Sequence, residues 1–157
     1  MSRIVFATDL HLTEGQGGLT PFATDLQEIS ALSPDLLVMG GDICLWESGA
    51  GDQLQHLLGE TSFPTVGVMG NQDTDRAPTE SEQAHRALAE HDAPAPAFDQ
   101  DFSTRFGSRN RHMDLGDAHV VVLNTCRMDL GHEGWRNVRA EVGTDDLAWL
   151  DATLAGL

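Results

Sequence analysis

The sequence contains no lysine and no tyrosine, has only two cysteines, and shows no long apolar run. Because no run approaches the ~20 residues of a membrane span, and no basic segment precedes a signal-type apolar core, we expect no membrane partner and a cytoplasmic location. Cys44 and Cys126 form no Cys-x-x-Cys pair, which argues against a disulfide framework and a cysteine zinc site. We interpret both as small buried or strand-end residues.

Positive charge is also scarce. The chain has 25 acidic residues against nine basic ones, all arginine, and its net charge is −16. Such a charge repels phosphate backbones, so nucleic acid is not an expected partner unless metal ions mediate the contact. The length of 157 residues and the hydrophobic content of 40% predict a single domain over residues 1–157.

Three short apolar runs in the first half of the chain are each followed by possible metal ligands. These are 4–6 followed by Asp9 and His11, 36–39 followed by Gly41 and Asp42, and 65–69 followed by Gly70, Asn71 and Asp73. Such runs are typical of buried strands, and α/β sheets hold ligands beyond the carboxyl ends of their strands. The glycines permit sharp turns, so the pattern places the ligands together at one sheet edge.

Carboxylate, imidazole and amide oxygen together suit Mn²⁺, Fe or Zn²⁺, and a shared carboxylate can bridge two ions about 4 Å apart. The alternative is that Asp9, His11, Asp42 and Asn71 are ordinary turn or cap residues, because Asp and Asn are frequent there. A single match would favour that alternative. Three matches in order at consecutive strand ends favour a metal site.

These residues carry a family resemblance. The series Asp9-x-His11, Gly41-Asp42 and Gly70-Asn71-x-Asp73, each behind a predicted strand, resembles the calcineurin-like metallophosphoesterases. Segments 121–125 and 146–150 resemble later landmarks of the cyclic-nucleotide phosphodiesterase-like branch of that family. The resemblance implies an α/β fold, a layered sandwich of mixed β-sheets flanked by helices.

The resemblance also implies an activity, the hydrolysis of a small phosphomonoester or phosphodiester at a centre of two divalent ions. Asp9 and His11 would hold the first ion, Asp42 would bridge the pair, and Asn71 would hold the second. The ions would lower the pKa of water toward neutrality and stabilise charge on the phosphoryl oxygens. Asp73 is open to two interpretations, a residue that orients the asparagine loop or a histidine, and a simple turn carboxylate.

Two departures from the family pattern bear on this activity. Gln72 stands where most of the family has a histidine that contacts the phosphate and helps to protonate the leaving group. Glutamine can donate a hydrogen bond but cannot act as an acid, so we expect a reduced rate or a restriction to good leaving groups. The family's later histidines and strands follow a helix that resembles 145–154, so we also expect a C-terminally short domain that forms a homo-oligomer or is completed by another chain.

Three functional hypotheses follow. The first is a metal-dependent phosphoesterase, compact by nature or completed by another chain. The second is a non-catalytic module that binds metal or a partner through a partial site. The third is a metal-dependent DNA nuclease, which the charge disfavours. His132 is open as a substitute ligand, although the resemblance favours a place near the substrate.

Other side chains have local explanations. We expect the remaining histidines to be solvated or locally bonded; these are His56, His85, His91, His112 and His119. Phe98, Phe102 and Phe106 recur every four residues, which we interpret as a loop or strand that packs on the core, in preference to a substrate-stacking face. The cluster of Arg105, Arg109 and Arg111 either attracts a phosphate or pairs with nearby carboxylates.

The remaining elements are predicted from capping and turn residues. We expect a helix that begins at Thr20-Pro21, helices over 52–59 and 79–91, a hairpin of 111–115 with 118–124, a loop over 125–143, and a final amphipathic helix capped by Thr144-Asp145-Asp146.

Overall fold

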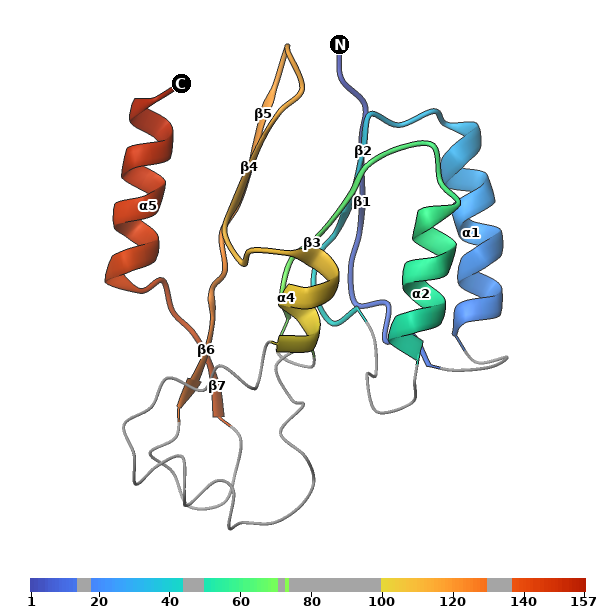
Figure 1. Ribbon diagram of the computed structural model, residues 1–157, viewed down its shortest axis with the longest axis horizontal. Coiled ribbons are helices and arrows are strands. Elements are labelled where there is room, and N and C mark those ends of the chain that lie inside the picture. The colour runs from blue at the N-terminus through green and yellow to red at the C-terminus, as the bar shows by residue number, and fades with distance from the viewer. Residues whose placement is uncertain (14–17, 44–49, 71–72, 74–99, 130–136) are drawn as a thin grey trace.

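The computed structural model describes residues 1–13, 18–43, 50–70, 73, 100–129 and 137–157. Its first half contains β1 (Ile4–Ala7), α1 (Leu19–Ala31), β2 (Leu36–Met39), α2 (Ala50–Gly59) and β3 (Thr65–Gly67). The strands form a parallel sheet in the order β1-β2-β3, as their apolar runs predict. Both helices lie on one side of this sheet (Figure 1).

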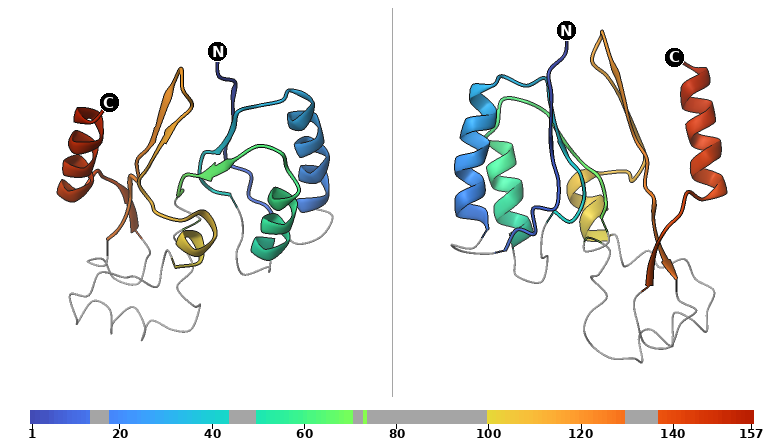
Figure 2. Two further views of the ribbon diagram at one scale, coloured as in Figure 1. Left: turned by 45° about the horizontal axis from the view of Figure 1, so that its top comes forward. Right: turned by 180° about the vertical axis from the view of Figure 1, so that it is seen from behind.

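The second half is built from short antiparallel pairs. Its elements are α4 (Gln100–Phe106), β4 (Arg111–Asp114), β5 (His119–Val122), β6 (Cys126–Asp129), β7 (Asn137–Ala140) and α5 (Thr144–Ala155). β4 pairs with β5, and β6 pairs with β7. The β4–β5 hairpin lies between the parallel sheet and α5, as the two views in Figure 2 show. The predicted mixed α/β architecture is confirmed.

The core has two sides because successive strand residues point to opposite faces of the sheet. Leu37 and Met39 of β2 join the cluster that includes Phe22 of α1. Leu36 and Val38 join a second cluster with Val122 of the hairpin. Every residue of β2 is buried, and each buried Leu or Met contributes about 1.5–3 kcal/mol of transfer free energy.

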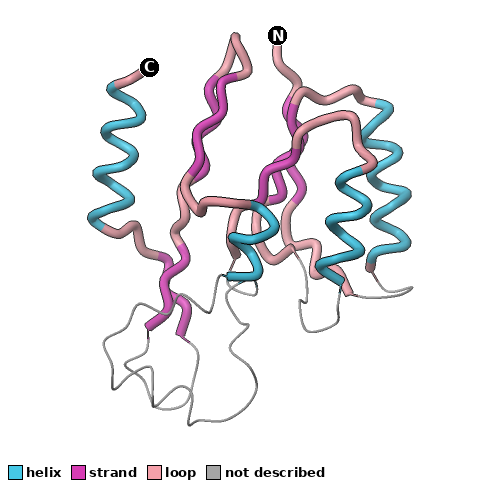
Figure 3. Tube along the Cα trace, viewed as in Figure 1, coloured by secondary structure: helices cyan, strands magenta, loops and turns pink. Residues whose placement is uncertain are grey.

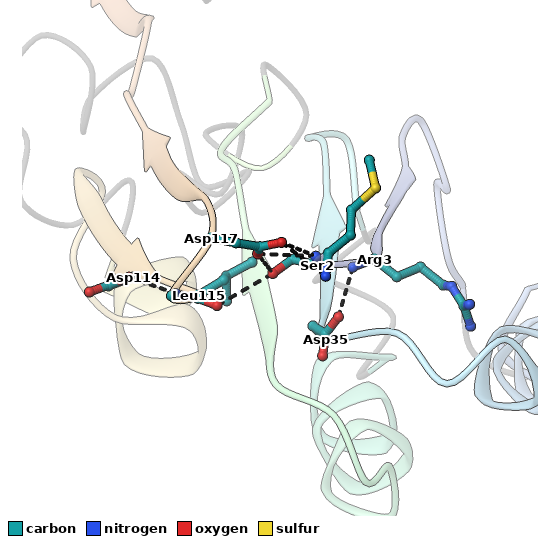
Figure 4. Close-up of polar contacts among 8 residues, drawn as sticks. Ser2, Arg3, Asp35, Asp114, Leu115 and Asp117 are labelled. Carbon is teal, nitrogen blue, oxygen red and sulfur yellow. Dashed lines mark hydrogen bonds and ion pairs between the residues drawn. The ribbon is translucent and has the colours of Figure 1, made fainter.

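Polar contacts join the residues before β1 to the hairpin turn (Figure 4). The Ser2 amide donates to the two carboxylate oxygens of Asp117 at 3.0 and 2.8 Å, and the Ser2 hydroxyl also bonds this carboxylate. The Arg3 amide donates to Asp35 Oδ2 at 2.7 Å. The amino-terminal edge of the parallel sheet is thereby fixed to the hairpin.

Helix α1 differs from the prediction at its start. It begins at Leu19, with Gly18 as the N-cap and no side-chain capping bond, so Thr20 is not the cap. Pro21 lies in the first turn, where a missing N–H costs no intrahelical bond. The reason is tertiary: the Leu19 and Phe22 side chains are both buried, and this packing sets the start of the helix.

Two predictions for the second half need correction, and a third is not tested. Residues 125–143 are not simply a loop, because they contain β6 and β7. Both strands alternate polar and apolar residues, but each has only four residues, and the glycines of this segment favour a loop. Phe102 and Phe106 lie on helix α4, not on a loop or strand, although both are buried as predicted. The predicted helix over 79–91 lies outside the described residues.

The last helix, α5, has Gly143 as its N-cap, so the predicted cap residue Thr144 is instead its first residue. The Gly143 amide donates to Asp146 Oδ2 at 3.2 Å. The helix carries no buried residue, and Leu147 and Leu154 are 49% and 52% exposed. The predicted apolar stripe is therefore present in the sequence but covered by little of the described chain. No helix among the described residues is both long and apolar enough to cross a membrane.

Candidate metal centre

The loops that follow β1 and β2 run side by side at the carboxyl edge of the parallel sheet, in the lower half of Figure 3. The Asp9 amide donates to the Gly41 carbonyl at 3.1 Å, and the His11 amide donates to the Asp42 carbonyl at 2.8 Å. These bonds continue the contact between the strands beyond their ends. As a result, the predicted ligands on the loops after β1 and β2 lie close together.

The ligand-bearing residues have unusual backbone geometry. Asp9, His11 and Asp42 have φ angles of 56°, 45° and 49°, in the left-handed region that side chains other than glycine rarely adopt. Among the described non-glycine residues, Ser33 is the other one in this region. Each such residue costs on the order of 1–3 kcal/mol, and residues of this kind cluster at functional sites. The inter-loop bonds hold this strained geometry in place.

The side chains of these three residues converge. Each offers one ligand atom, and the three atoms lie within 4.8 Å of one another. His11 Nε2 is 4.0 Å from Asp42 Oδ2, and the Asp42 side chain is only 13% exposed. Thr8 Oγ1 donates to Asp9 Oδ2 at 2.8 Å, which orients that carboxylate. Two carboxylates and an imidazole form a donor set that suits Mn²⁺, Fe or Zn²⁺, so the residues present fit a metal ion.

Two glycines allow the loops after β2 and β3 to touch. Gly41 has a φ of +97°, and a Cβ atom at this position would lie 2.9 Å from the Gly70 Cα atom. A Cβ atom at Gly70 would overlap the Asp42 amide nitrogen and its carboxylate. The close approach therefore requires glycine on both sides, and it brings the third loop against Asp42.

The buried Asp73 side chain accepts hydrogen bonds from the loops after β2 and β3. The side chain is 1% exposed; Oδ1 accepts the Ile43 amide at 3.0 Å, and Oδ2 accepts the Gly70 amide at 2.9 Å. A carboxylate that accepts bonds from two backbone amides fixes their relative position. This geometry favours the first of the two interpretations of Asp73, an orienting residue, over a simple turn carboxylate.

A polar chain that the sequence analysis did not identify leads from α5 to this region. Asn110 Nδ2 donates to Asp146 Oδ1 at 2.7 Å, and Asn110 Oδ1 accepts the Asn124 amide at 2.9 Å. Asn124, 1% exposed, accepts the Cys126 amide at 2.9 Å, and Cys126 Sγ donates to the Met69 carbonyl at 3.2 Å. The sequence signal is an Asn directly after an apolar strand, which by itself is common in turns.

The pKa of the Cys126 thiol depends on the charges in this region. Burial raises the pKa of the Cys126 thiol, and the negative charges of Asp42 and Asp73 raise it further. The thiol therefore lies close enough to the Asp42 and Asp73 carboxylates for their charges to affect its pKa. Negative charge beside this thiol favours a bound cation.

Other predicted residues have separate outcomes. Asn71 and Gln72, the predicted second-ion ligand and phosphate contact, lie outside the described residues, as do His132 and Cys44. Arg105 forms an ion pair with Asp52, with 2.7 Å between Nη1 and Oδ1, so the pairing alternative is the one observed for this arginine. His56 is locally paired, as expected, with Glu60 just beyond the end of α2, with 3.5 Å between Nε2 and Oε1.

Comparison with known proteins identifies the family. The sequence model of the calcineurin-like phosphoesterase family matches residues 2–151, which is nearly the whole chain. No curated protein and no solved structure gave a match. The matched region includes all three converging side chains and the parallel sheet that positions them. This chain belongs to the calcineurin-like phosphoesterase family.

Proposed function

We propose that this protein hydrolyses a small phosphomonoester or phosphodiester at a dinuclear metal centre. The observation that carries the proposal is the convergence of Asp9, His11 and Asp42 within 4.8 Å in a member of this family. In order along the chain, they follow the ligand pattern that the sequence resemblance implies. Divalent ions held there would lower the pKa of water and stabilise charge on phosphoryl oxygens.

The chain's own residues have distinct parts in this proposal. Asp9 and His11 would hold the first ion, Asp42 would be shared by both ions, and Asn71 would hold the second. Asp73 positions the loops that carry Asp42 and Asn71, through its bonds to the Ile43 and Gly70 amides. Gln72 donates a hydrogen bond to the substrate phosphate. Because glutamine supplies no proton, substrates with good leaving groups react fastest.

The second candidate function is metal or partner binding without turnover. It is favoured by Gln72, which removes the acid that most of the family has at this position, and by the exposed apolar residues of α5. A DNA nuclease is the weakest candidate because the net charge of −16 repels a duplex. The candidates differ in one observable, the turnover of a small phosphoester in the presence of Mn²⁺.

Substitution of Asp42 by Asn tests the proposal. The variant keeps the shape of the side chain but removes the charge that the two ions would share, so Mn²⁺-stimulated hydrolysis should fall by at least ~100-fold. The assay uses 4-nitrophenyl phosphate and bis(4-nitrophenyl) phosphate, whose leaving groups need little protonation. The matched control is Asp25→Asn on the exposed side of α1, which should keep full activity.

Two results would separate the candidates. Unchanged Mn²⁺-dependent turnover in Asp42→Asn would contradict the proposed site. Mn²⁺ binding by the unaltered chain without hydrolysis of either ester would contradict the enzymatic proposal and support the binding module. Cleavage of linear duplex DNA in preference to both esters would support the nuclease.

A further inference from the structure

The β4–β5 hairpin carries a second group of metal-ligand side chains, separate from the centre described above. His112 Nε2 and His119 Nδ1 are 3.0 Å apart, and the two rings are stacked with centroids 5.2 Å apart. Asp114 Oδ1 lies 3.8 Å from the same His119 nitrogen. Two imidazole nitrogens therefore meet, and a carboxylate lies beside one of them.

Strand register explains why these residues meet. His112 and Asp114 are two positions apart on β4, so they point to the same face, and Asp114 is directly opposite His119 on β5. All three are exposed. The opposite face of the hairpin carries Met113 and Val120, which pack on the parallel sheet. The ligands thus project from a backbone that the core holds in place.

The spacing of the two nitrogens is close to what a metal ion requires. With Zn–N bonds of about 2.0–2.1 Å and tetrahedral angles, two ligand nitrogens are about 3.3 Å apart. The observed 3.0 Å is a contact in which one ring donates and the other accepts. If the two imidazole rings move apart by a few tenths of an ångström, a metal ion can bind both nitrogens in place of the proton that they share. Exposed side chains on a fixed backbone can make this adjustment.

The carboxylate is already oriented. The Gly116 amide donates to Asp114 Oδ1 at 2.7 Å, which holds the side chain beside His119. Hydrogen bonds of this kind commonly fix ligands around bound metals. A net charge of −16 also draws cations to the surface of this chain. Imidazole-rich sites with one carboxylate favour Zn²⁺, Cu²⁺ and Ni²⁺ over Mg²⁺ or Ca²⁺.

We propose that His112 and His119, with Asp114 beside His119, form a second transition-metal site, in which the two imidazoles bind Zn²⁺ or a similar ion and link β4 to β5. The site lies toward the hairpin turn, which is fixed to Ser2 ahead of β1, whereas Asp9 and Asp42 follow the carboxyl ends of β1 and β2 (Figure 1). It is independent of the proposed hydrolytic centre. An ion here stabilises the hairpin and adds to the metal content of the chain.

The first test counts Zn²⁺ ions by calorimetric titration of the full chain in an Asp42→Asn background, with and without the hairpin histidines. Replacement of both His112 and His119 by Ala should remove one binding event from this background, and either single replacement should weaken that event roughly tenfold or more. The matched control, His56→Ala, removes an exposed histidine from α2 and should leave binding unchanged. Equal Zn²⁺ affinity with and without the two hairpin histidines would overturn the proposal.

A second measurement needs no substitution in the hairpin. Substoichiometric Cu²⁺ added to the ¹⁵N-labelled chain should broaden the amide signals of residues 111–114 and 119–122 before others, because the paramagnetic ion acts over short distances. Broadening confined to residues elsewhere, with sharp hairpin signals, would overturn the proposal. Thermal unfolding with Zn²⁺ should also show a higher midpoint for the Asp42→Asn chain than for the same chain without the hairpin histidines.

Discussion

The parallel sheet with α1 and α2 differs from the region after residue 100, whose last helix, α5, buries no side chain. Leu54 of α2 is fully buried, whereas Leu147 and Leu154 of α5 are about half exposed. The first region also places Asp9, His11 and Asp42, while the second reaches that site through the polar chain that ends at Cys126. The ligand geometry therefore depends on the parallel sheet and the two helices packed on it.

The same substitution in the two helices tests this comparison with the largest expected effect. Leu54→Ala removes a fully buried side chain and should reduce the free energy of unfolding by about 2–5 kcal/mol. Leu154→Ala removes a side chain that is 52% exposed and should change it by no more than about 0.5 kcal/mol. Urea unfolding of both variants gives the difference. Equal losses would mean that α5 is packed as tightly as α2 in solution.

The glycine contact between the loops gives the next effect. Gly70→Ala places a methyl group against Asp42, so the loops must separate, at a cost of about 1–3 kcal/mol and with weaker Mn²⁺ binding. Gly59→Ala is the control, because a Cβ atom at the end of α2 meets nothing within 4 Å. It should leave stability unchanged or raise it slightly. Mn²⁺ affinity that survives Gly70→Ala would show that the loop contact does not position the ligands.

The buried carboxylate gives an effect of about 2 kcal/mol. Asp73→Asn replaces one accepting oxygen by an NH₂ group, which faces a backbone N–H donor, either of Ile43 or of Gly70. Asp151→Asn, an exposed position on α5, should have almost no effect. Chemical unfolding measures stability, and amide exchange of Ile43 and Gly70 reports the bonds directly. Unchanged exchange at both amides would contradict the positioning role.

The smallest effect concerns the contact between the two regions at Ser2 and Asp117. Hydrogen bonds from the Ser2 hydroxyl, and then from the amino end of the chain, lower the pKa of Asp117. A carboxyl with a lowered pKa stabilises the fold above its ordinary pKa of 3.8 and loses this contribution as the pH falls through the lower, folded-state value. Asp117→Asn should therefore unfold slightly more easily at neutral pH but match the unaltered chain in strong acid. A difference that persists in acid would contradict this origin.

The sequence predicts the first region well because its signals are local. Each strand of the parallel sheet is a continuous apolar run, and a glycine or an aspartate marks where the run ends. Local signals cannot reveal that Asp73 is buried, since its burial depends on two loops that meet in space. The same limit applies to Thr20. Its sequence predicts a helix cap, but the packing of Leu19 and Phe22 makes the helix begin one residue earlier.

The second region shows where sequence patterns lose information. The hairpin of β4 and β5 is predicted from the strand-like segments on either side of its Gly116-Asp117 turn. β6 and β7 alternate over only four residues each, within a segment whose glycines favour a loop. Helix α4 carries Phe102 and Phe106, whose spacing alone we interpret as a loop or strand. The pairing of His112 with His119 follows from strand register, which becomes known only when the hairpin is built.

The most direct test of the metal centre is the manganese content of the purified chain after Mn²⁺ loading and desalting. It is best measured in the chain that lacks His112 and His119, so that the hairpin does not contribute. A dinuclear centre predicts two Mn²⁺ ions per chain, and Asp42→Asn in the same background should retain at most one. Equal manganese content with and without the Asp42 carboxylate would contradict the assignment of Asp9, His11 and Asp42 as ligands.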